Sequence, residues 1–129
     1  MRGEEYMGKK VLIIEDNPDY ADLVGGQLKK EGFEVETAKT GKDGLRKAPI
    51  YRPDLITLDL GLPDMSGFEV CAQMKKIVAL GKCIIIVLSA KDDTGDITNA
   101  FHAGADDYVI KPPEPEYLVR KIKLYLGER

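Results

Sequence analysis

Five short apolar segments recur along the chain, and each has the length of a β-strand. They are Val11–Ile14, Phe33–Ala38, Leu55–Leu60, Ile84–Leu88 and Tyr108–Ile110. Several are apolar almost throughout instead of alternating, which is typical of strands that are covered on both faces. Each interval between them exceeds the roughly twelve residues that a helical crossover needs. The pattern therefore predicts a repeated βα unit that builds a parallel sheet.

Residue spacing and capping signals predict amphipathic helices in these intervals. Asn17-Pro18 offers a capping side chain and a proline for the first helical position. Tyr20, Val24 and Leu28 follow at four-residue spacing and predict one buried stripe. The first interval is therefore expected to be helical from its proline onward.

Two later helices carry similar signals. Ser66 and Glu69 form a capping box. The buried stripe predicted after it consists of Phe68, Cys71, Met74 and Val78. The last helix is predicted to follow Pro115, and its inward side chains are Leu118, Ile122 and Tyr125.

Alternating strands and helices over a chain of one-domain length predict a doubly wound α/β fold. Five parallel strands favour the order 2-1-3-4-5, with helices on both faces of the sheet and right-handed crossovers. In such sheets ligands bind beyond the carboxyl ends of the strands, at the switch point between the first and third strands. The functional residues are therefore expected at that edge.

Composition and charge narrow the classes of function. The 19 basic and 22 acidic side chains leave a net charge of −3, so no overall field attracts nucleic acid or an anionic membrane. The longest aliphatic run, Ile84–Leu88, is far shorter than the ~18 residues of a membrane-spanning helix, and the charged N-terminus lacks a secretory signal. We expect a cytoplasmic protein. Cys71 and Cys83, without a CxxC pair, predict reduced core thiols instead of a zinc site or disulfide.

Polar side chains follow four of the five predicted strands at their carboxyl ends. The first strand ends in Glu15-Asp16, the third runs into Asp59, the fourth into Ser89 and the fifth into Lys111. Three carboxylates in one crevice repel one another unless a positive group lies between them. Oxygen ligands without His or Cys suit a hard cation, and a partly hydrated Mg²⁺ is the natural candidate.

Four motifs, in order and in register, give the chain a resemblance to a known family. They are VLIIEDNPD (Val11–Asp19), PDLITLDLGLPDMSG (Pro53–Gly67), IIIVLSA (Ile84–Ala90) and GADDYVIKP (Gly104–Pro112). They resemble the receiver domains of two-component response regulators, which have the flavodoxin-like fold of CheY. The resemblance covers essentially the whole chain and implies a receiver domain at residues 9–127, after an N-terminal tail of residues 1–8.

The resemblance also implies a phosphoryl-transfer site. Asp59 would accept the phosphoryl group. Mg²⁺ would be held directly by Asp16, Asp59 and the backbone carbonyl of Gly61, and through a water molecule by Glu15. A carboxylate attacks a phosphoryl group poorly because both are anionic, so positive charge and in-line positioning would supply most of the catalysis.

The remaining site residues would contact the phosphoryl group or change position when it is present. Ser89 and Lys111 would contact it, and Tyr108 stands where the family has its aromatic switch residue. Inward movement of the Ser89 loop would free space into which Tyr108 rotates. The surface expected to change consists of the fourth helix, the fifth strand and the fifth helix, through couplings that are typically worth ~1–3 kcal/mol.

The sequence departs from the family pattern in three places. Pro113 follows Lys111-Pro112, the position of a common cis peptide bond, where many receivers have a hydrophobic or aromatic residue. Gly61 offers no side chain above the phosphoryl group, whereas Lys91, two residues after Ser89, offers a long cationic one. Gly61 leaves room for attacking water, and Lys91 could shield the phosphate or pair with it.

The expected partners follow from the same resemblance. The donor would be a phosphohistidine on a sensor histidine kinase or phosphotransfer protein, since the only histidine, His102, falls in a predicted helix away from the site. A downstream effector would read the changed surface, without direct nucleic-acid binding by this domain. The domain would be a monomer or a weak homodimer through that surface. It would not be an enzyme, although it would assist its own Mg²⁺-dependent phosphorylation and dephosphorylation.

The sequence disfavours two other classes of function. A phosphohydrolase of the haloacid dehalogenase type also uses a nucleophilic aspartate, but it needs a second acid two residues later, where this chain has Gly61. A flavodoxin-like or degenerate receiver would only bind a partner or a nucleotide. The chain has neither GxGxxG nor GxxxxGK[ST], and its acidic set is complete, so both features weigh against that class.

Overall fold

The computed structural model describes residues 6–90, 94–111 and 113–127. The expectations for Lys91 and for the Lys111-Pro112 bond fall on residues outside these ranges.

A five-stranded parallel sheet forms the centre of the molecule, and its order β2-β1-β3-β4-β5 confirms the predicted topology. The strands are β1 (Lys10–Ile14), β2 (Glu34–Ala38), β3 (Leu55–Asp59), β4 (Ile84–Ser89) and β5 (Asp107–Ile110). No predicted strand boundary is wrong by more than one residue. Phe33 lies outside β2 because its amide donates to the Leu28 carbonyl and closes the preceding helix.

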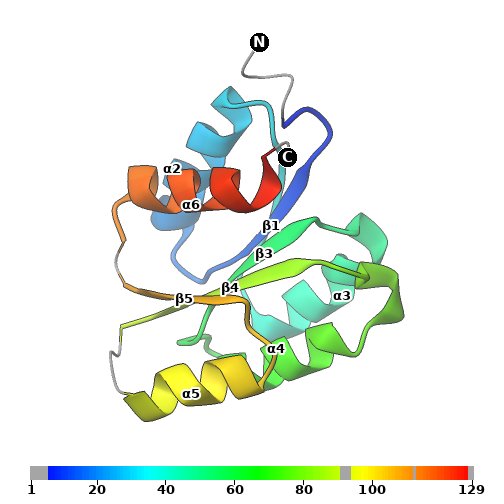
Figure 1. The fold of residues 1–129 in the computed structure, drawn as a ribbon, viewed down its shortest axis with the longest axis vertical. Helices are drawn as coiled ribbons and strands as arrows, with labels where there is room; N and C mark the ends of the chain where they lie inside the picture. Colours follow the sequence, from blue (N-terminus) through cyan, green and yellow to red (C-terminus); the bar gives the residue numbers. More distant parts are fainter. Residues whose placement is uncertain (1–5, 91–93, 112, 128–129) are drawn as a thin grey trace.

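Helices cover both faces of this sheet (Figure 1). They are α2 (Pro18–Lys30), α3 (Gly41–Tyr51), α4 (Gly67–Lys75), α5 (Thr94–His102) and α6 (Pro115–Leu126). Helices α2 and α6 lie side by side on one face, and α3, α4 and α5 lie on the other. None of the described helices has both the length and the apolar content needed to cross a lipid bilayer.

Alternate residues of the strands divide the core into two layers. Val11 and Ile13 of β1 pack toward α2 and α6, whereas Leu12 and Ile14 pack toward α3 and α4. All four side chains are at most 2% exposed. Burial on both faces explains why the strands read as continuous apolar segments.

The helix starts follow the sequence signals more closely than the helix ends. Asn17 caps α2, because its side-chain oxygen accepts from the amides of Asp19 and Tyr20. Ser66 caps α4 through the Phe68 amide, but the Glu69 carboxylate accepts from Gln73 instead of closing the predicted box.

Helix α4 is shorter than the predicted stripe. It ends at Lys75, and the 3₁₀ turn Val78–Leu80 follows, so extending the helical stripe to Val78 was wrong. The amides of Lys76 and Ile77 donate to carbonyls three residues back, which tightens the chain into 3₁₀ geometry. Phe68 is only half-buried, whereas Cys71 and Met74 are in the core as predicted.

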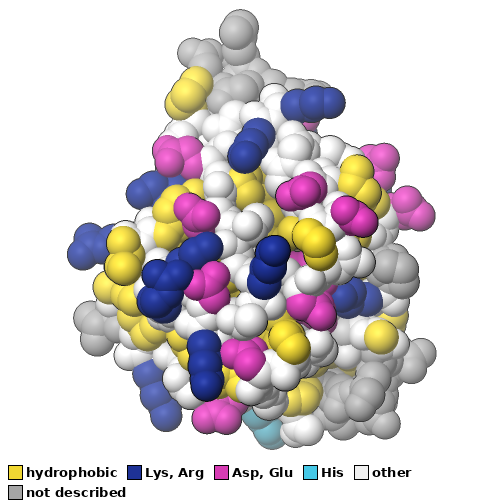
Figure 2. Space-filling model, turned by 180° about the vertical axis from the view of Figure 1, so that it is seen from behind, with side chains coloured by type: hydrophobic (Ala, Val, Ile, Leu, Met, Phe, Trp, Pro, Cys, Tyr) yellow, Lys and Arg dark blue, Asp and Glu magenta, His cyan; other side chains and the backbone are white. Residues whose placement is uncertain are grey.

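Charged side chains of both signs are interspersed on the face seen in Figure 2. A separate group of polar side chains connects β5 to α6. The Asp107 carboxylate accepts from Lys121 Nζ and from Tyr125 Oη, each at 2.9 Å, and from the Tyr108 amide at 2.8 Å. Burial alone raises the pKa of Asp107, but these three hydrogen bonds outweigh burial, and its pKa lies below the usual value.

Replacing Asp107 by Asn should destabilise the fold in a pH-dependent way. A carboxyl with a lowered pKa in the folded state adds stability above its unfolded pKa, and that stability is lost as the pH falls through the folded pKa. Asp107→Asn should therefore lower the free energy of unfolding by ~1 kcal/mol at pH 7, and the difference from wild type should shrink below about pH 4. Urea denaturation at both pH values measures this. Asp22→Asn, an exposed acid in α2, is the control; an equal effect there, or a pH-independent difference at Asp107, contradicts the assignment.

Candidate functional site

The carboxyl ends of the strands bring the predicted site residues to one edge of the sheet. Strands β1 and β3 are neighbours, as are β3 and β4, and β4 and β5. The residues at these four strand ends are Glu15, Asp16, Asp59, Ser89 and Lys111. Residues far apart in sequence thus meet because parallel strands all point to the same edge.

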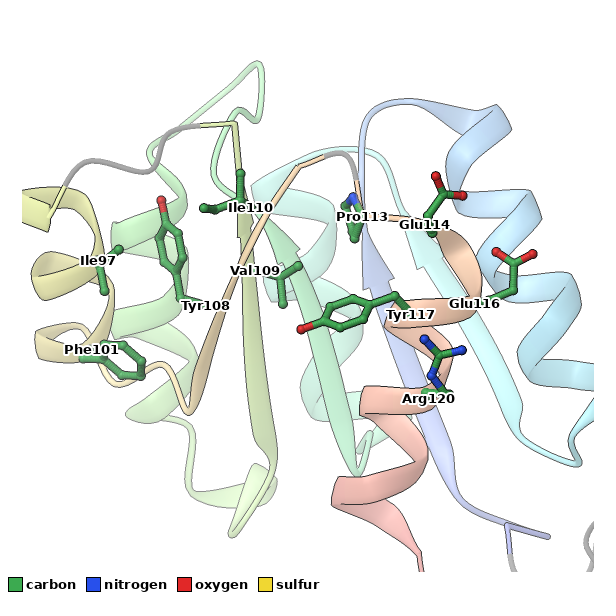
Figure 3. Close-up of a pocket in the computed structure, with 10 residues that line it drawn as sticks. All are labelled: Ile97, Phe101, Tyr108, Val109, Ile110, Pro113, Glu114, Glu116, Tyr117 and Arg120. Atoms are coloured by element: carbon green, nitrogen blue, oxygen red, sulfur yellow. The ribbon is translucent and has the colours of Figure 1, made fainter.

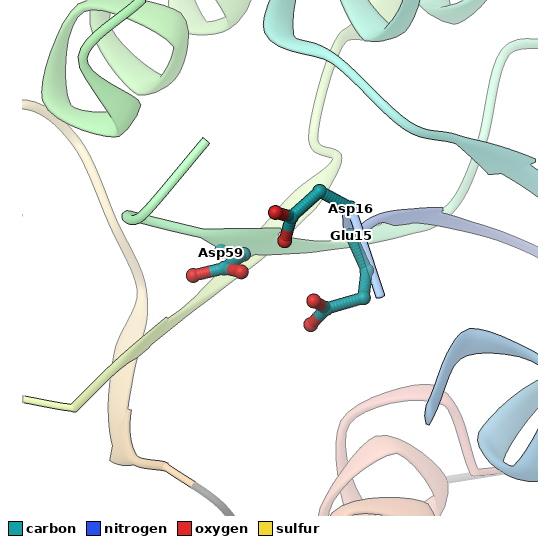
Figure 4. Close-up of side chains that lie close together, drawn as sticks. All are labelled: Glu15, Asp16 and Asp59. Atoms are coloured by element: carbon teal, nitrogen blue, oxygen red, sulfur yellow. The ribbon is translucent and has the colours of Figure 1, made fainter. Parts of the chain in front are cut away.

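Three carboxylates converge where β1 and β3 end (Figure 4). One oxygen from each of Glu15, Asp16 and Asp59 lies within 4.8 Å of the others. Glu15 and Asp59 are buried, at 3% and 4% exposure, whereas Asp16 is exposed. Two of the three charges are therefore largely removed from water, where an uncompensated carboxylate is costly.

The ammonium of Lys111 bridges the two buried carboxylates. Its Nζ lies 2.9 Å from Asp59 Oδ2, and 3.3 and 3.4 Å from the two oxygens of Glu15. These carboxylates raise the pKa of Lys111 although burial opposes them, so the amine stays protonated. One positive charge therefore faces three acidic groups.

The two buried acids differ in their tendency to ionise. Burial, followed by the charge of Asp59, raises the pKa of Glu15 to about 7. Burial also opposes ionisation of Asp59, but the hydrogen bonds from Lys111 and the Gly61 amide outweigh it and lower the pKa of Asp59. Negative charge is therefore concentrated on Asp59, at the end of the central strand.

Backbone amides complete the support of both acids. The Gly61 amide donates to Asp59 Oδ1 at 2.8 Å, and the Asn17 amide donates to Glu15 Oε2 at 3.1 Å. A Cβ added at Gly61 would meet only Asp59 Oδ1, at 3.5 Å, within otherwise open space. The loop thus leaves the Asp59 carboxylate accessible from the side of Gly61.

Three residues that support the site were not among the predicted site residues. The first is Asn17, through its amide. The second is Asp64, whose carboxylate accepts from the Gly41 and Lys42 amides at the start of α3. The third is Gly67, where a Cβ would come 2.6 Å from the Leu60 Cα. Only Gly67 carried a usable signal, since a glycine directly after a capping serine indicates close packing.

A hollow of about 410 Å³ opens above these residues. Its lining consists of Asp16, Asp59, Leu60, Gly61, Phe68, Ser89, Ala90 and Lys111. Ser89 is buried at 5% exposure, and its carbonyl accepts from the Lys111 amide at 2.6 Å. The hollow is large enough for a small anion beside the Asp59 carboxylate.

Tyr108 lies in a different hollow, on the face formed by α5, β5 and α6. This second hollow has a volume of about 1010 Å³ (Figure 3). The half-buried Tyr108 ring lies between β5 and α5, beside Ile97 and Phe101. The structure therefore places the predicted switch residue next to free space, but outside the lining of the acidic hollow.

The acidic group suits a hard divalent cation. Its donors are carboxylate oxygens from Glu15, Asp16 and Asp59, and within the described residues no His or Cys belongs to the group. Oxygen donors with excess negative charge favour Mg²⁺ or Ca²⁺ over softer metals. The residues present therefore fit the cation that the sequence predicted.

Comparisons with known proteins agree with this geometry. Residues 11–123 match the model of the response regulator receiver domain. The chain is 37% identical over 120 residues to the alkaline phosphatase synthesis transcriptional regulatory protein PhoP of Bacillus subtilis, covering 93% of this chain and 49% of PhoP. It is 40% identical over 121 residues to the transcriptional regulatory protein AfsQ1 of Streptomyces coelicolor, covering 92% and 52%. The chain thus spans about half the length of these curated relatives.

A solved structure shows the same architecture over nearly the whole of both chains. The CheY-like response regulator receiver domain protein from Methanospirillum hungatei superposes with a TM-score of 0.83 at 34% identity, covering 92% of this chain and 93% of that one. The chain belongs to the family of response regulator receiver domains.

Proposed function

We propose that this receiver domain accepts a phosphoryl group on Asp59 from a phosphohistidine of a sensor histidine kinase or phosphotransfer protein. The proposal depends chiefly on one observation: a buried, ionised carboxylate has an ammonium 2.9 Å away at the floor of an open hollow. A phosphohydrolase of the dehalogenase type is disfavoured, since Gly61 lacks the acid that would protonate a leaving group.

The chain's own residues would supply positioning and charge in this reaction. An Asp59 oxygen forms the new P–O bond, and the electron pair of the broken P–N bond leaves with the donor imidazole. Lys111 reduces the repulsion between Asp59 and the incoming group, and Ser89 can donate its hydroxyl to a phosphoryl oxygen. Positioning and electrostatics dominate phosphoryl transfer, so a fixed carboxylate and a fixed ammonium are the main requirements.

The cofactor in this proposal is Mg²⁺. Asp16, Asp59 and the backbone carbonyl of Gly61 would hold it directly, and Glu15 would do so through water. When bound, the ion supplies positive charge that offsets the charge of the phosphoryl oxygens. The same groups would also assist hydrolysis of the aspartyl phosphate, so that the domain acts on its own phosphorylation and loss of phosphate without being an enzyme.

The output would be a change of the surface formed by α5, β5 and α6. A phosphoryl group on Asp59 adds a dianion that draws the Ser89 hydroxyl inward. Tyr108, which now lies beside Ile97 and Phe101, would then rotate into the space that the Ser89 loop vacates. A downstream effector, or a second copy in a weak homodimer, would recognise this surface, and the domain itself would not contact nucleic acid.

The domain boundaries and compartment are also proposals. We assign the receiver domain to residues 9–127, the tail to residues 1–8 and the protein to the cytoplasm. Within the tail, Tyr6 is buried and stacks on Phe33, with ring centroids 4.7 Å apart. The Lys123 ammonium lies 5.7 Å from the Tyr6 centroid, so the end of the tail packs on the domain.

Phosphorylation should depend on Asp59. Incubation of wild type with acetyl phosphate and Mg²⁺ should add one phosphoryl group, detected by intact-protein mass spectrometry, and Asp59→Asn should add none because the nucleophilic carboxylate is lost. Asp22→Asn, an exposed acid, is the control and should react like wild type. An unmodified wild type, or equal labelling of Asp59→Asn, would contradict the proposed function.

Substitutions at Asp16 and Lys111 should change the affinity for Mg²⁺ in opposite directions. Asp16→Asn removes an anionic ligand and should weaken Mg²⁺ binding at least ~10-fold. Lys111→Met removes a competing positive charge and should strengthen it, although both variants should be labelled more slowly than wild type. Calorimetric titration measures the affinities, and Lys30→Met, at the exposed end of α2, is the control. Unchanged affinity in both site variants would contradict the proposed metal site.

A further inference from the structure

The segment that follows Lys111 has few means of being fixed in place. Two prolines, Pro112 and Pro113, come directly after the lysine, and neither can donate a backbone hydrogen bond. Only carbonyl groups and packing can therefore hold the segment.

One tyrosine hydroxyl from a distant part of the chain contacts the second of these prolines. Tyr20, in the first turn of α2, donates from Oη to the Pro113 carbonyl at 3.0 Å. Pro113 is buried, and the Tyr20 ring packs against the core layer between the sheet and α2 and α6. On its other side Lys111 is held by its own amide, which donates to the Ser89 carbonyl at 2.6 Å. Hydrogen bonds thus fix the backbone at Lys111 and again at Pro113, two residues later.

The Tyr20 hydroxyl is well suited to act as a permanent hydrogen-bond donor. Burial, followed by the charges of Glu15 and Glu114, raises the pKa of Tyr20 to about 12. The proton therefore stays on the oxygen at neutral pH. Removing the hydroxyl would deprive the carbonyl of the buried Pro113 of this partner, and buried backbone carbonyls are normally hydrogen-bonded.

We propose that Tyr20 is a positioning residue for phosphoryl transfer, acting through the Pro113 carbonyl to keep the Lys111 ammonium between Glu15 and Asp59. This inference rests on the proposed function of Asp59. Helix α2 begins at Pro18, two residues after the acidic pair, so the tyrosine would fix the lysine relative to the acids that it must neutralise. Small errors in the placement of a charged group are costly in such sites.

A double-mutant cycle tests whether Tyr20 acts through Lys111. Tyr20→Phe keeps the ring and deletes only the donor, and it should lower the maximal rate of labelling by acetyl phosphate ~10-fold with little change in half-saturating donor concentration. In a Lys111→Met background the same change should have no further effect. Tyr125→Phe, which loses a hydroxyl bond to Asp107, is the matched control and should keep the wild-type rate.

A second measurement separates this inference from the proposed function. The Lys111 ¹³Cε resonance, assigned by its loss in Lys111→Met, should shift in Tyr20→Phe and stay unchanged in Tyr125→Phe. A wild-type rate in Tyr20→Phe, or an equal slowing with and without Lys111, would overturn the inference. Failure of wild type to be labelled would overturn the proposed function. The Lys111 resonance would then test by itself whether Tyr20 positions the lysine: a shift in Tyr20→Phe supports this role, and no shift overturns it.

Discussion

Two buried carboxylates that share one ammonium are the interaction on which the rest of this site depends. Glu15 and Asp59 are almost fully removed from water, and Lys111 contacts both. Removing one member of such a buried group leaves an uncompensated charge, which typically costs ~3–5 kcal/mol. With Asp16 added, the group keeps an excess of negative charge that a divalent cation can neutralise. Lys111 offsets part of this charge in the folded protein, and the excess that remains makes the site receptive to a cation.

The fold holds these charges in place with rigid elements. Asp59 ends the central strand β3, which is paired on both sides and buried throughout. Asn17 has two roles: its amide donates to Glu15, and its side chain caps α2. The start of this helix and the orientation of the buried acid are therefore fixed together. Asp64 likewise ties the loop after β3 to the start of α3, so the open side of the hollow is also anchored.

The sequence was informative where the physical signal was local. Strand positions, their order and the polar residues at strand ends followed from continuous burial and from the directionality of parallel sheets. The end of α4 depends on how the chain tightens after Lys75, and the half-buried Phe68 lines the acidic hollow at the start of that helix. Helical periodicity reports neither feature. The contact between Tyr20 and Pro113 joins residues 93 positions apart, and it exists only once α2 and the chain after β5 are both in place.

Lys111 also connects the acidic hollow to the surface around Tyr108. Its ammonium contacts the acids, while its amide is bonded to the Ser89 carbonyl at the end of β4. Ser89 pairs in register with Ile110 of β5, and Tyr108 is two residues further back along that strand. A new anion on Asp59 would therefore act on one lysine in two ways, through the charge of its side chain and through the strand ends that its backbone joins. A coupling of ~1–3 kcal/mol is sufficient to redistribute two conformations of such a surface, so the fold itself need not rearrange.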